Sequence, residues 1–218
     1  MNNGSKICVS IGKMPAEMIK GILDKVEMAE IRIDLVKLDA RDLKEVFSAH
    51  SNLIATCREG FYNDTGRGRL LEDAIGYGAA MVDIEADADP AWREQMVKKV
   101  KASGCKLILS MHNYTHTPSV AELKGLVDEM FGMGADIAKI ATQVNQPSDA
   151  AALLGLYADY KNIVALGMGP MGVITRLASP LLGAPFTFAS FGDNPVTAAG
   201  QIEYSEMAEL IKRISSYG

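Results

Sequence analysis

Short runs of β-forming residues return about every 25 residues along this chain, and most are separated by segments of helical periodicity. The eight runs are KICVSI from Lys6, AEIRID from Ala29, NLIATCR from Asn52, MVDIEA from Met81, KLILSMH from Lys106, ADIAKIA from Ala135, NIVALGM from Asn162 and PFTFAS from Pro185. The helical segments cover 14–26, 39–49, 69–77, 91–102, 119–131 and 148–160, with a shorter one at 172–178. Apolar strands that alternate with helices indicate a parallel sheet covered by helices.

Eight such units in 218 residues fit a closed (β/α)8 TIM barrel. The alternative is an open, doubly wound sheet, which usually carries a Gly-rich phosphate turn after its first strand. Here that turn reads SIGKMPAE, with a single glycine, so the GxGxxG pattern is absent. No linker or charge run divides the chain. We therefore predict an α/β fold, with residues 1–218 forming one barrel domain.

The composition of the chain argues against several classes of binding partner. The net charge is −5 and Lys and Arg are not clustered, which argues against nucleic acid or a membrane surface as partner. No apolar run is long enough to span a membrane, and the first residues do not resemble a signal peptide. Cys8, Cys57 and Cys105 lie far apart without metal-ligand spacing, so we expect buried free thiols, no structural zinc and a cytoplasmic location.

Polar side chains recur near the ends of the predicted strands, where a barrel forms its active site. Because side chains alternate along a strand, parity identifies those that share a face with the barrel interior. These polar residues are Ser10, Glu30, Arg32, Asp34, Thr56, Arg58, Asp83, Glu85, Ser110, His112, Lys139 and Ser190. Their convergence at comparable heights predicts one polar site at the barrel mouth.

Lys139 is the most informative of these residues, because it lies in the apolar strand ADIAKIA and lysine is almost never buried without a partner or a role. One interpretation is a strand-end lysine whose amine reaches solvent. The other is an amine made nucleophilic towards a carbonyl by desolvation and neighbouring cations. We adopt the second.

His112 ends the adjacent strand and suits acid–base chemistry near neutral pH, although a hydrogen-bonded structural histidine is the alternative. His116 follows in a loop, and the helix and Glu of a zinc motif are missing, so we predict no metal site.

Three arginines, Arg32, Arg58 and Arg176, are candidates for a carboxylate clamp, since guanidinium matches a carboxylate bidentately. The alternative is internal pairing with Glu30, Asp34 or Asp83. The sequence leaves both open.

Taken together, the motifs resemble the type I 3-dehydroquinate dehydratase family of the shikimate pathway. The resemblance runs from Lys6 to Ile202 and rests on KICVSI, EIRID at 30–34, TCR at 56–58, SMH at 110–112, AKIA at 138–141, the Arg176 region and GQI at 200–202. Each motif is weak alone, but their order and spacing are specific.

The resemblance implies a barrel enzyme, commonly a homodimer, that needs no cofactor or metal. In that family the ketone of 3-dehydroquinate condenses with the lysine matching Lys139. The histidine matching His112 removes a proton beside the iminium, water leaves by syn elimination, and hydrolysis releases 3-dehydroshikimate. Arg176 is then expected to hold the substrate carboxylate. The other substrate contacts implied are Ser10, Glu30, Arg32, Arg58, Thr197 and Gln201.

The chain departs from the family pattern in three places. The family often has a longer Arg-x-x-x-Glu-Gly stretch whose Glu orients the histidine, whereas this chain reads REGF at 58–61. We expect either Glu59 or Glu85 to orient His112, and we take Glu59 as the third catalytic candidate. Thr197 replaces a serine, with TAAGQ in place of SAPGQ, and Asn113 stands where an Asp is common.

Two other functions fit a barrel with such a lysine. A Schiff-base aldolase of the keto-deoxy-phosphogluconate type would bind phosphate through loops after the last two strands, but SFGDNPVTAAGQ is a poor phosphate cradle. A catalytically silent metabolite-binding barrel would have little reason to keep Lys139, His112 and Arg176 together. We also expect residues 191–201 to act as a lid over the site.

Overall fold

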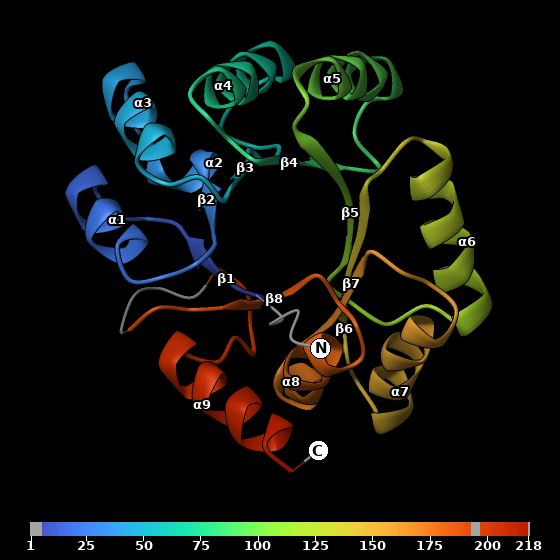
Figure 1. The fold of residues 1–218 in the computed structure, drawn as a ribbon. Coiled ribbons are helices and arrows are strands. Elements are labelled where there is room, and N and C mark those ends of the chain that lie inside the picture. Colours follow the sequence, from blue (N-terminus) through green and yellow to red (C-terminus); the bar gives the residue numbers. More distant parts are fainter. Residues whose placement is uncertain (1–5, 193–196, 218) are drawn as a thin grey trace.

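The computed structural model, which describes residues 6–192 and 197–217, has eight parallel strands surrounded by helices (Figure 1). The strands are β1 (Lys6–Ile11), β2 (Ala29–Arg32), β3 (Leu53–Thr56), β4 (Met81–Glu85), β5 (Lys106–Asn113), β6 (Ile137–Gln143), β7 (Ile163–Met168) and β8 (Phe186–Ala189). Each run predicted from the sequence overlaps one of them, and β5 and β6 extend beyond the predicted ends. The (β/α)8 prediction is therefore confirmed.

The strands pair in the order β7-β6-β5-β4-β3-β2-β1-β8, so β1 lies between β2 and β8. Within the described residues no ladder joins β7 to β8, and the barrel is nearly closed. Helix α8 (Val173–Leu181) contacts both of these strands. The strand register places polar residues of neighbouring strands opposite one another: Ser10 opposite Glu30, Thr56 opposite Asp83 and Ser110 opposite Lys139.

The helices form the outer ring (Figure 1). They are α1 (Ala16–Leu23), α2 (Ile33–Val36), α3 (Ala40–Ala49), α4 (Asp64–Gly76), α5 (Pro90–Ser103), α6 (Val120–Gly132), α7 (Pro147–Gly155), α8 and α9 (Tyr204–Ser215), with 3-10 turns at Leu156–Ala158 and Pro170–Gly172. Several begin at side chains that cap the free backbone amides. Asp39, Asn63, Asp89 and Ser119 each accept a bond from the first turn of their helix. None of the described helices is long and apolar enough to cross a membrane.

Several elements differ from the sequence prediction, and three of these differences have a clear physical reason. Strand β2 ends at Arg32 rather than Asp34, because the chain turns directly into α2. Helix α4 begins at Asp64, well before the predicted 69, since its first turns contain two glycines that weaken the helical signal. No helix was predicted after the last strand, where α9 lies. Its sequence is largely polar, and the helix buries the side chain of Met207.

The barrel interior is apolar at its base and polar two residues further along the same strands. Eight apolar side chains fill the base: Cys8, Met28, Ile54, Met81, Ile108, Ile137, Val164 and Phe186. Leu166 and Phe188 belong to the same apolar cluster and also line the cavity above it. Ile54, Ile108 and Ile137 are each followed at the second residue by a polar group that points into the same interior. The apolar base therefore excludes water from beneath the polar layer.

Two pairs of glycines bring the loops after β7 and β8 close together. A Cβ on Gly167 would lie 2.7 Å from Cα of Gly172, so the turn into α8 can pack this tightly only without side chains. Gly200 has a φ of +80°, and a Cβ there would lie 2.8 Å from the carbonyl oxygen of Gly169. These approaches place α8 and the 197–201 segment at one side of the barrel mouth. Residues 193–196 of the predicted lid lie outside the described residues.

A buried arginine joins β3, β4 and α4 beside the mouth. Arg67 is 2% exposed, and its guanidinium donates to the carbonyl of Cys57 at 3.0 Å and to Glu85 at 2.7 Å. It also pairs with Asp64 at 3.1 Å and lies 4.5 Å from the ring centroid of Trp92. The network fixes the backbone immediately before Arg58.

We expect Arg67→Ala to lower the free energy of unfolding by about 2–4 kcal/mol, because it leaves Glu85 and the Cys57 carbonyl without their buried partner. Urea unfolding measures this loss. Lys99→Ala is the matched control, since it breaks only the exposed pair with Glu72 and should cost less than about 1 kcal/mol. Equal losses in the two variants would contradict the structural role of Arg67.

Candidate active site

A cavity of about 300 Å³ opens at the C-terminal ends of the strands. All but one of the site residues predicted from the sequence line it: Ser10, Glu30, Arg32, Arg58, His112, Lys139, Arg176, Thr197 and Gln201. The exception is Glu59. Side chains from most of the strands and from the loops after β7 and β8 therefore meet in one enclosure of small-molecule size.

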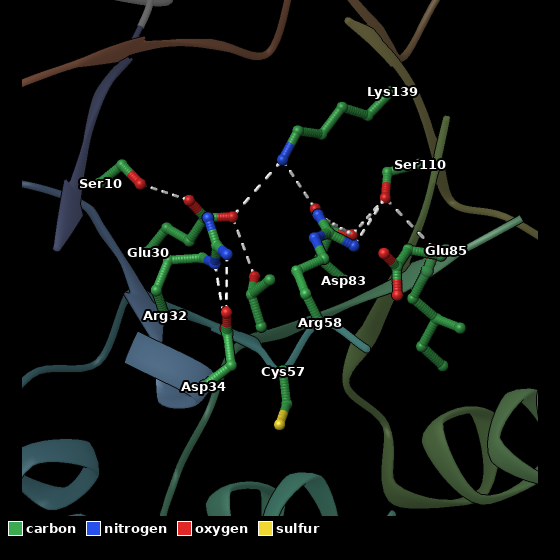
Figure 2. A network of polar contacts seen from close by, with 12 residues as sticks. Ser10, Glu30, Arg32, Asp34, Cys57, Arg58, Asp83, Glu85, Ser110 and Lys139 are labelled. Carbon is green, nitrogen blue, oxygen red and sulfur yellow. Dashed lines mark hydrogen bonds and ion pairs between the residues drawn. The ribbon is translucent and has the colours of Figure 1, made fainter. Parts of the chain in front are cut away.

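The amine of Lys139 lies between two buried carboxylates, as Figure 2 shows. Its Nζ is 2.8 Å from Oδ2 of Asp83 and 3.4 Å from Oε1 of Glu30. The Phe188 ring centroid lies 4.3 Å from the same nitrogen. The residue is 6% exposed, so the amine does not reach solvent in the way a strand-end lysine would. Its nearest charged neighbours are carboxylates rather than the cations expected from the sequence.

Asp83 links Lys139 to Arg58 and Ser110. Its Oδ1 accepts an ion pair from Arg58 Nη2 at 2.8 Å and a hydrogen bond from Ser110 Oγ at 2.6 Å. Burial alone would raise the pKa of Asp83, but the positive charges of Arg58 and Lys139 hold it below its usual range. The carboxylate is therefore ionised, and Asp83 is a site residue that the predicted set omitted.

Glu30 holds the second carboxylate of the pair. It accepts hydrogen bonds from Ser10 Oγ at 2.5 Å and Thr56 Oγ1 at 2.9 Å. Burial raises its pKa, but the positive charges of Lys139, Arg32 and Arg58 together hold the pKa below its usual value. Glu30, Asp83, Arg58 and Lys139 thus carry two negative and two positive charges, which balances the buried cluster.

The structure answers the question of how the arginines pair. Arg32 makes a bidentate pair with Asp34, with bonds of 3.0 and 2.7 Å (Figure 2). Arg58 pairs with Asp83. Two of the three arginines therefore have internal carboxylate partners.

Arg176 is different. It is 2% exposed, and among the described residues it forms no ion pair. Nη2 donates to the carbonyl of Ala199 at 3.3 Å, while Nε has no partner in the described part of the chain. Burial lowers the pKa of Arg176 to about 10, so the guanidinium is still charged at neutral pH. A buried cation with an unpartnered donor at a cavity wall is suited to bind an anion.

Two threonines fix the backbone that carries Arg176. Thr175 Oγ1 accepts a bond from the Gly167 amide at 2.7 Å and donates to the Gly172 carbonyl at 2.6 Å. Thr187 Oγ1 donates to the carbonyl of Arg176 itself at 2.8 Å.

Thr197 and Gln201 form the side of the cavity that follows β8. Thr197 Oγ1 donates to Ser10 Oγ at 2.8 Å, which continues the chain of hydroxyls from Glu30. The Gln201 amide exchanges hydrogen bonds with Thr197 through its Nε2 and Oε1 atoms. The hydroxyl at 197 thus connects this loop to β1.

His112 lies on β5, next to Lys139 on β6, where the ladder pairs it with Ala141. Burial, followed by the positive charges of Arg58 and Lys139, lowers the pKa of His112 to about 3. The imidazole is therefore neutral at physiological pH and able to accept a proton.

Neither predicted orienting carboxylate contacts His112. Glu59 is exposed and lies outside the cavity lining, and Glu85 is ion-paired with Arg67 at 2.7 Å. A catalytic role for Glu59 stays a prediction that this arrangement does not support.

Several residues of the cavity wall were not predicted as site residues, among them Tyr114, Gln143 and Phe188. Strand parity identifies Gln143 and Phe188, because they share faces with Lys139 and Phe186. In the described residues no group of three or more His, Cys, Asp or Glu side chains is placed to hold a metal ion.

Comparison with known proteins agrees with this geometry. The family model for type I 3-dehydroquinase matches residues 7–217. A 3-dehydroquinate dehydratase from Dehalococcoides mccartyi is 33% identical over 218 residues, which cover 96% of each chain. One from Desulfotalea psychrophila is 33% identical over 221 residues and covers 95% of this chain and 97% of its own.

Among solved structures, the type I enzyme from Clostridium difficile superposes with a TM-score of 0.85 at 24% identity. The match covers 98% of this chain and 94% of that one. This likeness supports the fold. On the family match and the curated relatives, the chain belongs to the type I 3-dehydroquinase family.

Proposed function

We propose that this protein dehydrates 3-dehydroquinate to 3-dehydroshikimate, a step of the shikimate pathway, through a Schiff base on Lys139. The observation that carries the proposal is the buried amine of Lys139 between Asp83 and Glu30 in a cavity that also holds His112 and Arg176. Membership of the family supports a hydro-lyase rather than an aldolase or a silent barrel.

The carboxylates suit an imine mechanism because the charge at the nitrogen is the same before and after condensation. In its ion pairs Lys139 is an ammonium, and the protonated imine formed with the substrate ketone is also a monocation. Asp83 and Glu30 therefore stabilise the iminium through the contacts that already hold the amine. The amine must give up a proton before it attacks, and the neutral His112 accepts it. His112 then returns that proton to the carbinolamine oxygen, which leaves as water when the iminium forms, so the imidazole is neutral again.

His112 then acts as the base. The iminium acidifies the adjacent C–H, and the neutral imidazole accepts that proton. The same group, now protonated, returns a proton to the departing hydroxyl, so water leaves and the conjugated product forms. Hydrolysis of the imine regenerates Lys139.

Arg176 binds the substrate carboxylate. Two observations support this: Nε has no hydrogen-bond partner among the described residues, and burial lowers the pKa of the guanidinium, so a bound carboxylate would stabilise its charge. The remaining contacts to the hydroxyl groups or the carboxylate of the substrate are expected from the other predicted residues that line the cavity: Ser10, Glu30, Arg32, Arg58, Thr197 and Gln201. A cytoplasmic location, expected from the free cysteines, and a homodimer, implied by the resemblance, remain predictions.

Lys139→Ala removes the covalent electron sink, so turnover should fall to background in an ultraviolet assay for the conjugated enone product. Borohydride with 3-dehydroquinate should add mass to the unmodified protein and none to the variant, as measured by intact-mass spectrometry. Circular dichroism checks that the variant is folded. An adduct that persists in Lys139→Ala would remove the residue from the covalent step.

His112→Ala keeps the amine but loses proton transfer, so we expect kcat to fall by about 10²–10⁴-fold while borohydride still traps substrate on Lys139. In the unmodified enzyme the acid limb due to His112 should lie below its ordinary pKa of 6.5, since the base form persists down to the lowered value. A pH profile of kcat/KM measures this. A variant with unchanged kcat would exclude His112 from the reaction.

Arg176→Ala should weaken substrate binding by about 2–5 kcal/mol, because it removes a buried partner of the carboxylate. Steady-state KM and product-inhibition constants measure the change. Arg69→Ala, an exposed arginine on α4 outside the cavity lining, is the control. If both constants are unchanged in Arg176→Ala, the carboxylate binds elsewhere.

A further inference from the structure

The imidazole of His112 makes no hydrogen bond or ion pair with the described residues, although an acid–base histidine needs a fixed ring orientation. Of the two carboxylates expected to orient it, Glu59 is exposed and Glu85 is ion-paired with Arg67. A different group must therefore hold the ring.

Tyr114 stacks on it. His112 is in β5, Tyr114 follows directly after the end of the strand at Asn113, and both side chains line the cavity. Their ring centroids are 6.1 Å apart, and the planes are tilted by only 12°. This is within the range of an offset-stacked aromatic pair.

The backbone around Tyr114 is fixed from within its own turn. Oδ1 of Asn113 accepts hydrogen bonds from the amide and hydroxyl of Thr115, at 3.0 and 2.8 Å, and from the amide of His116 at 3.1 Å. The side chain of residue 113 therefore closes the turn that carries the tyrosine.

The same turn is fastened to the next strand. Asn145 Nδ2 donates to the carbonyl of Thr115 at 2.8 Å, and Thr117 Oγ1 donates to the carbonyl of Gln143 at 2.9 Å. Asn113 itself is in register with Thr142 in the β5–β6 ladder. Tyr114 is thus mounted on backbone held from both sides, close to Lys139 on β6.

We infer that Tyr114 is a positioning residue that holds the plane of His112 for proton transfer and covers the ring from solvent. The inference rests on the proposed role of His112. The outer part of Tyr114 is free, since the residue is 73% exposed, so its substitution should not disturb the core.

The charged groups that act on His112 are Arg58 from the end of β3, Lys139 from β6, Asp83 from β4 and Glu30 from β2. Tyr114 adds an uncharged contact to this set, so aromaticity rather than the hydroxyl should matter.

The test compares Tyr114→Phe with Tyr114→Leu. An aromatic pair is worth a factor of roughly 2–12, so the leucine variant should lose about that much in kcat with little change in KM, while phenylalanine should retain it. The yield of the borohydride adduct on Lys139 should be unchanged in both. The pKa of His112, followed by NMR in the free enzyme, should rise towards its ordinary value only in the leucine variant, where water reaches the ring.

Phe61→Leu is the matched control, because Phe61 is an exposed aromatic of the loop after β3 that does not line the cavity. It should leave kcat and the His112 titration unchanged. A leucine variant at 114 with the kcat and His112 pKa of the unmodified enzyme overturns the inference, and so does a phenylalanine variant as impaired as leucine. Failure of the unmodified enzyme to form an adduct would instead overturn the proposed function.

Discussion

The site is organised by a lysine ammonium buried against two carboxylates. Lys139 cannot be desolvated at the base of a barrel mouth without matching negative charge, and Asp83 and Glu30 provide it. Those carboxylates must themselves be balanced, which is the task of Arg58 on one side and of the hydroxyls of Ser10 and Thr56 on the other. The chemistry proposed here uses this arrangement unchanged, because it replaces one cation at the nitrogen with another.

The barrel makes such a cluster possible by stacking layers. An apolar floor, with Ile54, Ile108 and Ile137 among its members, lies directly beneath the polar residues and removes water from that side. The close glycine contacts after β7 then bring α8 near the mouth, where Arg176 completes the opposite wall. Its guanidinium lacks a carboxylate partner among the described residues, whereas Arg32 and Arg58 both have one. This difference supports the proposal that Arg176 binds the substrate carboxylate.

Much of this could be predicted from the sequence, because strand parity in a barrel is a local property. Alternation within each run was enough to indicate that Lys139, His112 and Glu30 share the interior, and the eight-fold rhythm predicted the fold. Pairing was not predictable, since the partner of Arg58 or Glu85 depends on the stagger between strands and on loops such as the shortened one after β3. Tyr114 was missed for a related reason: its role depends on the turn made by Asn113, which follows the strand. The glycines in the first turns of α4 weakened the signal for its start, and the largely polar sequence of α9 left that helix unpredicted.

The most direct test of the account is a crystal structure of the enzyme reduced with borohydride in the presence of 3-dehydroquinate. We predict a single carbon–nitrogen bond from Nζ of Lys139 to the former ketone carbon, with the new secondary amine still within hydrogen-bond distance of Asp83. The ligand carboxylate should lie on Arg176 and the imidazole of His112 beside the carbon that loses its proton. A bond to another lysine, or an adduct whose nitrogen has left the two carboxylates, would contradict the central claim.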